Sequence, residues 1–450
     1  MATPSTVTAV TTDAFVSTFD IHKPSIRNIL FRKYGNQGYG FFHVLDTLGY
    51  RTPVDQTTYS HYEEDWIHQT VSSRNAVAAP GAGLPISFTL SADDLDASNR
   101  FFIQVNDDVM FINQVTGTVT DIDVTVPGAP VVTVEPHQAT DDIGALGQGD
   151  AIIIYSDDWA EGTAQPPGHV NIPIKYNFNA KIVKVTSEAT GSEMTNRVWV
   201  DYMSDGQKLG AWYWKGQIDA DYEMAARIDG ALLFDRPTTN ATLTAAGNRT
   251  TFGLVPWVRS GGNVDTYVPG FYSINDFDAT NETLDANFAP NEMLELLGIT
   301  ANIEISNLFT NSFDAGSIVY ASFAKGQKAV DLNIDFSSFS KNGRTWHFKR
   351  MDSFNHPKFY GAPGFNFRNM MIMTPMDKQR DADPSGKGNM IPSIGMRYKA
   401  LGGYNRQMKV WRTGGAQAST NQTDKDEMNH RTEMGSEYIA SNRFFLTEAA

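Results

Sequence analysis

The first candidate metal site in the sequence is a segment that contains two histidines. His61 and His68 enclose three acidic residues at positions 63–65. Histidine and carboxylate side chains are common zinc ligands. On a strand, however, His61 and Glu63 share one face and His68 lies on the other. The spacing therefore favours an exposed polar strand over a metal site.

A second candidate segment, residues 381–390 with the sequence DADPSGKGNM, resembles the start of a calcium-binding loop. Four of its residues are in register with such a loop: Asp381, Asp383, Ser385 and Gly386. The twelfth position is Pro392, whereas an EF-hand requires a bidentate glutamate there. We expect a turn and no calcium site.

Catalytic motifs are missing from the sequence. The adjacent acids Asp157 and Asp158 are the pair closest in kind to the two carboxylates of a glycosidase, but neighbours on a strand point to opposite faces. There is no G-x-S-x-G, H-E-x-x-H, P-loop or G-x-G-x-x-G after a strand. The absence of cysteine excludes disulfides, thiol catalysis and cysteine-bound metals. We predict no catalytic, cofactor-binding or metal-binding residue, and a protein that is not an enzyme.

The elements that would position these residues centre on one long helical pattern over 205–235. Its hydrophobic stripe has spacings of three and four and consists of Trp214, Ile218, Tyr222, Ala225, Ile228 and Leu232. The other faces largely hold charged residues, namely Lys215, Asp219, Glu223, Arg227 and Asp229, of which Glu223 and Arg227 form a favourable i,i+4 pair. Such a helix would be roughly 45 Å long. It is typical of a beam that joins separate parts; the alternative is a core helix of an ordinary α+β enzyme.

Composition limits the classes of function. The 450 residues suffice for two or three domains, and 12% aromatic residues favour a β-rich protein. A net charge of −15 argues against a dedicated nucleic-acid binder and against docking on anionic membranes. Lys349, Arg350 and Arg344 form a local basic cluster, which we interpret as a solvated face. No signal peptide and no membrane-spanning run of apolar residues is visible.

The first 200 residues predict an arm followed by an interrupted hairpin. Residues 1–45 read as an arm, and residues 57–72 as a strand exposed on both faces. Residues 77–165 hold about five short strands in a stretch typical of a small β-barrel. Strand-like segments at 46–76 and 166–200 flank this barrel, as if it were inserted at the tip of a long hairpin.

Beyond the long helix, residues 250–415 mix strands with short helices. We expect a short helix at Ala289–Leu297 and a strand at Asp331–Phe336. Residues 394–398 should pair with 408–410 across the turn at 402–405. The last segment, from Asp424 to the end, reads as one strand.

This order of parts resembles the major capsid proteins of tailed double-stranded-DNA bacteriophages of the Hong Kong 97 type. The sequence GLVPWV at 253–258 is similar to the segment through which that family's chain enters its axial domain. The run from Glu433 to Glu437 and the run from Asn442 to Leu446 are similar to its C-terminal strand. The amino-acid sequences of the hairpin and of the C-terminus most resemble those of capsid proteins of crAss-like phages.

The resemblance implies an α+β fold with defined parts. These would be an N-terminal arm (1–45), an E-loop (46–76 and 166–200), a peripheral (P) domain with a spine helix (201–249 and 416–450), an axial (A) domain (250–415) and an inserted β-barrel (77–165). Two features depart from the family. Little sequence precedes the arm, so no built-in scaffolding segment is visible, and the insertion lies outside the minimal fold.

The resemblance also implies a function. Copies of the chain would form hexamers and pentamers of an icosahedral head that encloses double-stranded DNA without sequence-specific binding. Portal, scaffolding and auxiliary or decoration proteins would be partners, with no membrane and no cofactor. The protein would reside in the virion after assembly in the cytoplasm of the bacterial host. The alternatives are another phage structural protein of the tail or decoration, or a secreted β-rich glycan-binding protein or glycosidase.

Overall fold

The computed structural model divides the chain into two compact units. Unit 1 comprises Met1–Ser60 and Asn177–Ala450, and unit 2 comprises His61–Tyr176. The structure describes residues 40–64, 70–95, 99–166, 168, 173–195, 203–204, 207–208, 212–314, 338–380, 390–414 and 423–450. Most of the predicted arm, His68, the predicted strand Asp331–Phe336 and residues 381–389 therefore lie outside the described residues.

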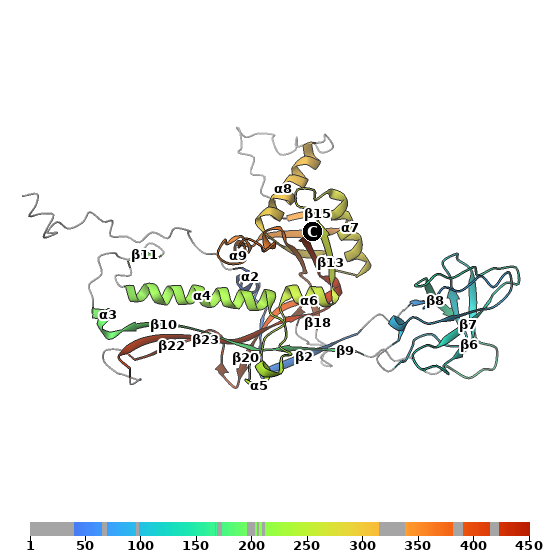
Figure 1. Ribbon diagram of the computed structural model, residues 1–450, viewed down its shortest axis with the longest axis horizontal. Coiled ribbons are helices and arrows are strands. Elements are labelled where there is room, and N and C mark those ends of the chain that lie inside the picture. The colour runs from blue at the N-terminus through green and yellow to red at the C-terminus, as the bar shows by residue number, and fades with distance from the viewer. Residues whose placement is uncertain are drawn as a thin grey trace, which may run out of the picture. The chain divides into compact units, whose positions relative to one another are not determined.

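The first sheet of unit 1 joins segments from the whole length of the chain (Figure 1). Its order is β1 (Arg51–Val54), β20 (Ile394–Leu401), β23 (Lys425–Tyr438) and β10 (Lys181–Thr190). The short strands β21 (Tyr404–Asn405) and β22 (Lys409–Thr413) pair with β20 and β23. The antiparallel β10–β23 pair runs from Lys181–Met434 to Thr190–Lys425, so the sheet cannot form before the C-terminal strand arrives.

Two expectations about the C-terminal part are wrong. The final segment forms two strands in different sheets, β23 and β24 (Phe445–Ala449), because the chain turns at Ala440, with φ at 59°, into the 3-10 helix η4 (Ser441–Arg443). The predicted hairpin is also replaced. Strand β20 pairs with β21 across the predicted turn. Residues 409–413, in β22, pair with β23 instead of β20.

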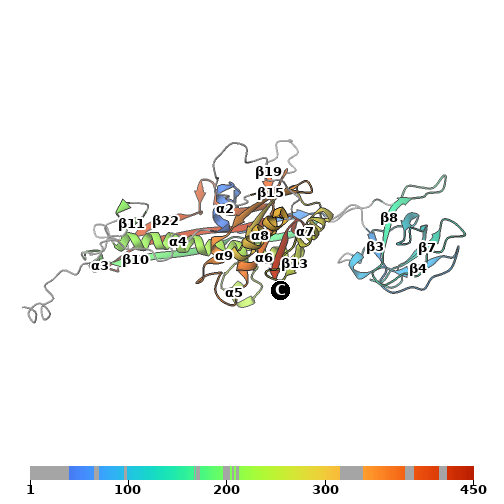
Figure 2. The same ribbon diagram turned by 90° about the horizontal axis from the view of Figure 1, so that it is seen from above.

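The long helix is α4 (Trp212–Phe234), 23 residues that lie along the first sheet (Figures 1 and 2). It begins later than expected, since β11 (Met203–Ser204) and β12 (Gln207–Lys208) precede it. At 1.5 Å per residue it is roughly 35 Å long. The predicted stripe is confirmed toward its C-terminal end, where Ile228 and Leu232 are fully buried.

The charged face of α4 is confirmed only in part. Arg227 Nη2 pairs with the Glu223 carboxylate across one turn, as the spacing predicts. Asp229 was expected on an outer face but is 2% exposed. It follows Ala225 by four residues and precedes Leu232 by three, so it falls on the buried stripe.

The second sheet of unit 1 has the order β13 (Asn263–Tyr267), β24, β17 (Met371–Pro375), β14 (Glu292–Leu297), β16 (Arg344–Arg350) and β15 (Ser338–Lys341). Helices α7 (Ile274–Ala286) and α8 (Ile299–Asp314) supply residues to the core on one face, among them Phe277, Leu284, Ala301 and Ile305. The predicted helix Ala289–Leu297 is wrong, because this segment holds the central strand β14. A short buried apolar run has no periodicity that separates strand from helix.

The remaining elements of unit 1 are short. They are α2 (Phe41–Thr47), α3 (Gly191–Thr195), α5 (Ala241–Ala245), α6 (Leu254–Gly261), α9 (Asp352–Asn355), η3 (Phe367–Asn369), and the pair β18 (Lys378–Arg380) and β19 (Met390–Pro392). Strand β24 lies in the second sheet, whereas β20 and β22 belong to the first.

Unit 2 holds one six-stranded sheet. Its order is β3 (Thr70–Ser72), β8 (Ala151–Asp157), β5 (Asp107–Met110), β6 (Thr116–Asp123), β7 (Val131–Pro136) and β4 (Ile86–Thr89), with the 3-10 helix η1 (Ala92–Asp94) after β4. Backbone hydrogen bonds from Arg74 to Thr89 (2.8 Å) and from Ser91 to Ser72 (2.9 Å) join the two edge strands. The core inside includes Val71, Phe88, Val109, Val132 and Ile152. The expected barrel segment 77–165 lies within this unit.

Strands β2 (Thr58–Glu63) and β9 (Ile174–Asn179) form a two-stranded ribbon. Both connections between the units run through these strands, because each crosses a unit boundary. The expected single strand over 57–72 is therefore wrong: β2 pairs with β9, and β3 belongs to the sheet of unit 2.

Candidate functional site

The histidine that the sequence singled out has a local partner. His61 Nε2 lies 2.8 Å from Glu63 Oε1 on the same face of β2. The His61 ring also lies 5.9 Å from the ring of Tyr176 on β9. His68 and Asp65 lie outside the described residues. Within the residues that the structure describes, no group of three or more His, Asp and Glu side chains could hold a metal ion.

The structure places Asp157 opposite Asp107 of the neighbouring strand β5, not beside Asp158 on one face. Asp157 Oδ2 accepts a hydrogen bond from the indole N–H of Trp159 at 2.9 Å. Asp107 Oδ2 accepts one from the backbone N–H of Gln104 at 2.6 Å. These are local contacts at the ends of two strands, and they give Asp157 and Asp158 no common reacting geometry.

The basic cluster expected from Lys349, Arg350 and Arg344 is wrong. Arg344 is 3% exposed and donates to Asn281 Oδ1 (3.1 Å) and Asp285 Oδ1 (2.6 Å). Lys349 and Arg350 are exposed at the other end of β16. Five residues of strand separate Arg344 from Lys349 by roughly 17 Å, so the three cations do not share a surface.

What the structure does bring together is an aromatic cluster at the unit 1 end of the ribbon. Tyr59 of β2 stacks on Phe178 of β9 with ring centroids 6.0 Å apart. The Phe178 ring lies 5.5 Å from Trp257 of α6, and Phe252 meets Trp257 edge-on at 5.3 Å. Tyr59, Phe178 and Trp257 are buried. The ribbon is thus anchored in the hydrophobic interior of unit 1.

Two buried tyrosine hydroxyls tie β23 to its surroundings. Tyr59 O–H donates to the carbonyl oxygen of Ser436 at 2.6 Å, and Tyr438 O–H donates to that of Leu232, in α4, at 2.7 Å. The backbone N–H of Ser436 donates to Thr251 Oγ1 at 2.9 Å. Burial raises the pKa of both tyrosines, so both hydroxyls remain protonated donors. These hydrogen bonds join the C-terminal strand β23 to the ribbon and to the long helix.

Asp229 of α4 caps the N-terminus of α2. The backbone N–H of Phe42 donates to Asp229 Oδ1 at 3.1 Å, where the first turn of a helix favours a negative charge. Gly40 precedes α2, and a Cβ there would collide with the Asp229 carboxylate and with Ser353 Oγ. Burial raises the pKa of Asp229 to about 6, although the hydrogen bond from Phe42 opposes this. The contact fixes the end of the predicted arm against the long helix.

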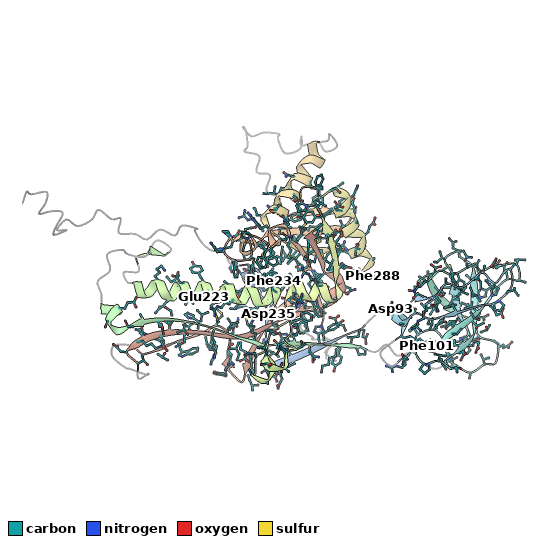
Figure 3. The ribbon with its side chains drawn as sticks, viewed as in Figure 1. Asp93, Phe101, Glu223, Phe234, Asp235 and Phe288 are labelled. Carbon is teal, nitrogen blue, oxygen red and sulfur yellow. The ribbon has the colours of Figure 1, made fainter. Side chains whose placement is uncertain are left out.

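The C-terminal end of α4 is held by a second acid and an aromatic ring (Figure 3). Lys181 Nζ, at the start of β10, lies 2.7 Å from Asp235 Oδ2. Burial raises the pKa of Asp235, and the hydrogen bond from Lys181 opposes this shift. The Phe234 ring lies 4.7 Å from both Tyr360 and Phe367. This end of the helix therefore contacts both the first sheet and the 356–369 loop.

Glu295 is a buried acid at the centre of β14. It is 0% exposed, and neither carboxyl oxygen has a hydrogen-bond partner within the described residues. Burial raises its pKa to about 8, so the carboxyl is neutral at pH 7. The sequence predicts a helix in this segment, so Glu295 is not among the candidate site residues. Its place between Leu294 and Leu296 was the available signal of a buried carboxyl.

No known protein family and no curated protein matches the sequence. Solved structures match over nearly the whole chain, but at low sequence identity. A structure from Gordonia phage Cozz has a TM-score of 0.43 at 10% identity and covers 100% of this chain and 98% of its own.

Two further structures show the same level of similarity. The capsid of a native GTA particle has a TM-score of 0.42 at 8% identity, covering 98% of this chain and 100% of its own. The holo-SrpI encapsulin complex from Synechococcus elongatus PCC 7942 has a TM-score of 0.38 at 9% identity, covering 96% and 94%. At these TM-scores the similarity carries no argument about function, which has to rest on the geometry of the chain.

Among the residues that the structure describes, no helix has the length and apolar character needed to span a membrane.

Proposed function

We propose that this chain is a structural subunit of a shell, the major capsid protein of a tailed double-stranded-DNA bacteriophage of the Hong Kong 97 type. One observation carries the proposal. The 23-residue helix α4 is fixed along a sheet of distant strands, and a paired ribbon leaves this layer for a separately folded unit. Such an arrangement serves contacts between copies better than the enclosure of a substrate.

The anchoring of the ribbon supports this function. A segment that reaches a neighbouring subunit transmits force to its own subunit only if its base is rigid. Tyr59 and Phe178 supply that base through the aromatic cluster and the hydrogen bond to Ser436. We assign β2 and β9 to the E-loop, and α4 with β23 to the spine and sheet of the peripheral domain.

The long helix with its sheet supports the same assignment. The C-terminal part of α4 is tied at two places, through Asp229 to α2 and through Lys181 and Asp235 to β10. The helix and the sheet therefore move as one layer. A layer of this kind suits a shell wall, in which each subunit meets several neighbours.

The proposal extends to the assembly. Copies form hexamers and pentamers of an icosahedral head around double-stranded DNA, with portal, scaffolding and auxiliary proteins as partners. The head assembles in the bacterial cytoplasm, and its phage is of the crAss-like kind. A wall that confines DNA needs no sequence-specific contacts, so an acidic subunit is acceptable.

Negative-stain electron microscopy of the purified full chain, with sedimentation velocity on the same sample, tests the proposal. We expect closed shells or capsomer-sized rings whose amount rises with protein concentration. Tubes or small trimers would favour another phage structural protein. A monomer at every concentration that bound a glycan would contradict a capsid role.

A further inference from the structure

Nearly all of the net negative charge of the chain belongs to unit 2. Residues 61–176 hold 17 Asp and Glu against three Lys and Arg, a net charge of −14. The remaining residues hold 34 acidic and 33 basic side chains, a net charge of −1. Unit 1 is therefore close to neutral, and a local group of cations on it is not offset by a general excess of acids.

Such a group exists on the first sheet of unit 1. Lys184 of β10 lies directly opposite Arg431 of β23, and Arg431 lies directly opposite Lys409 of β22. Directly opposed residues of antiparallel strands point to the same face, so the three cations stand side by side. We call Lys184, Arg431 and Lys409 the basic row.

The basic row faces away from the long helix. His430, the neighbour of Arg431, points to the other face, where it lies 2.8 Å from Asp221 of α4. Successive residues of a strand alternate between faces. Lys184 and Lys409 are exposed, and Arg431 is half-buried with its guanidinium 5.0 Å from the Trp411 ring centroid. The row is thus open to a partner.

The three cations differ from the others of this sheet in having no counterion. Elsewhere in the sheet the cations form ion pairs, namely Arg397–Glu437, Arg406–Glu433, Arg412–Asp426 and Lys425–Glu188. Within the part of the chain that the structure describes, no ion pair includes a member of the basic row. Like charges directly opposed across strands are destabilising. An anionic partner would remove that cost.

The surroundings of the basic row suit a protein partner. Trp411 is 40% exposed, Tyr404 is 59% exposed and Ile182 is 48% exposed. Ile182 lies two residues from Lys184 and Trp411 two residues from Lys409, on the same face of the sheet and on opposite sides of the row. Exposed aromatic residues beside arginine are typical of protein–protein contacts.

Unit 2 carries an acidic segment of matching size. Asp157, Asp158 and Glu161 are exposed, and no ion pair of the described residues includes them. The row covers two interstrand spacings, roughly 10 Å, and an extended segment of five residues reaches up to about 17 Å.

We propose that the basic row is a docking site for the acidic segment 157–161 of a second copy of this chain. The inference rests on the proposed self-assembly and names one charged contact within it. The cations of the row and the acids Asp157, Asp158 and Glu161 take part in no ion pair of the described residues, so their opposite charges make the contact attractive between copies. The other polyanion of suitable charge is a nucleic-acid backbone, and the experiment below separates the two.

Two charge-reversed variants test the contact. The row variant carries Lys184→Glu and Lys409→Glu, and the segment variant carries Asp157→Lys, Asp158→Lys and Glu161→Lys. Each alone should lose self-association about tenfold or more in sedimentation velocity at low salt. An equal mixture of the two should associate again, because each variant then meets its complement on the other chain. High salt should weaken the wild type, since the Debye length falls to about 3 Å at 1 M.

Controls separate folding and net charge from the contact. Lys349→Glu with Lys358→Glu makes the same charge change as the row variant at other exposed positions of unit 1, and this variant should associate like the wild type. Circular dichroism and thermal unfolding confirm that each variant folds. A chain that carries both sets of reversals should associate by itself.

Three results would overturn the inference, and they differ from failure of the proposed function. If the wild type assembles and both variants assemble equally well, the basic row is not the docking site. If both variants fail and their mixture does not recover, the contact is not between copies. If the row variant alone loses binding to a fluorescent DNA duplex and the mixture stays dissociated, the row serves nucleic acid. A wild type that stays monomeric at every concentration and binds a glycan contradicts the proposed function itself.

Discussion

The two units of this chain are built from opposite kinds of contact. The sheet of unit 2 comes from one continuous stretch, and each of its strands pairs only with strands of that stretch. Unit 1 depends on pairs between distant segments, such as β1 with β20 and β10 with β23. Unit 1 also buries acids such as Asp229 and Glu295, whereas unit 2 keeps all but one of its described acids at least partly exposed.

This difference indicates which unit is more sensitive to a single substitution. A unit made of one continuous stretch can fold without contacts to distant segments, and it can carry charged residues on its surface. A unit held by a few long-range contacts is sensitive to each of them. We therefore expect unit 1 to respond strongly to changes at its buried contacts, and unit 2 to remain indifferent to those changes.

The largest effect should come from Ile228→Asp. This residue is fully buried beneath α4, so the change removes an apolar side chain and buries a charge, at a cost of about 4 kcal/mol. Calorimetry of the full chain should show the unit 1 transition lowered or lost, with the unit 2 transition in place. Val132→Asp, at a fully buried position of unit 2, should do the converse.

The matched control for this pair is Ile182→Asp, the same substitution at a position that is 48% exposed on β10. It should change the free energy of unfolding by about 0.5 kcal/mol or less. If Ile228→Asp and Val132→Asp lowered both transitions together, the two units would not fold independently.

The next effect in size is a pH dependence confined to unit 1. Folded Glu295 has a pKa of about 8, above its unfolded value of 4.5. Its contribution to stability is complete below pH 4.5 and is lost as the pH rises through 8. Between pH 6 and 8 the free energy of unfolding of unit 1 should fall by up to about 1.4 kcal/mol per pH unit.

Glu295→Gln provides the control, because an amide of the same shape does not titrate. In this variant the fall of the unit 1 transition between pH 6 and 8 should disappear. Thermal unfolding at several pH values checks the result. A slope that persisted in the variant would assign the effect to another group, and an equal slope in unit 2 would contradict the contrast between the units.

The sequence predicts the parts of the fold that depend on local patterns, and it does not predict those that depend on pairing between distant segments. The helix α4 and the strands of unit 2 were visible because their signals are local, in the stripe around Ile228 and the alternation before and after the 127–130 turn. Pairing between distant strands leaves no local signal, so β23 and β24 were read as one strand. The burial of Asp229 was missed although its spacing placed it on the stripe.

A smaller effect is expected at the hydroxyl of Tyr59. Its O–H donates to the Ser436 carbonyl in a buried site, so Tyr59→Phe leaves that oxygen without this donor, at a cost of about 1–2 kcal/mol. Chemical denaturation monitored on the unit 1 transition measures the change. Tyr62→Phe on the same strand, where the side chain is 63% exposed, should have almost no effect. Equal effects of the two variants would show that the hydrogen bond from the Tyr59 hydroxyl to Ser436 does not help to anchor the ribbon.

The smallest effect tests the independence of unit 2 directly. A fragment of residues 61–176 contains every strand of the six-stranded sheet and the bonds that join its edges. It should unfold cooperatively, with a free energy within about 0.5 kcal/mol of unit 2 in the full chain. A fragment of residues 177–450 lacks α2 and β1, which contact Asp229 and β20, and should unfold less cooperatively than unit 1. If the 61–176 fragment failed to fold while unit 1 tolerated the loss of its N-terminal part, the contrast between the two units would be reversed, because unit 2 would then be the part that depends on distant segments.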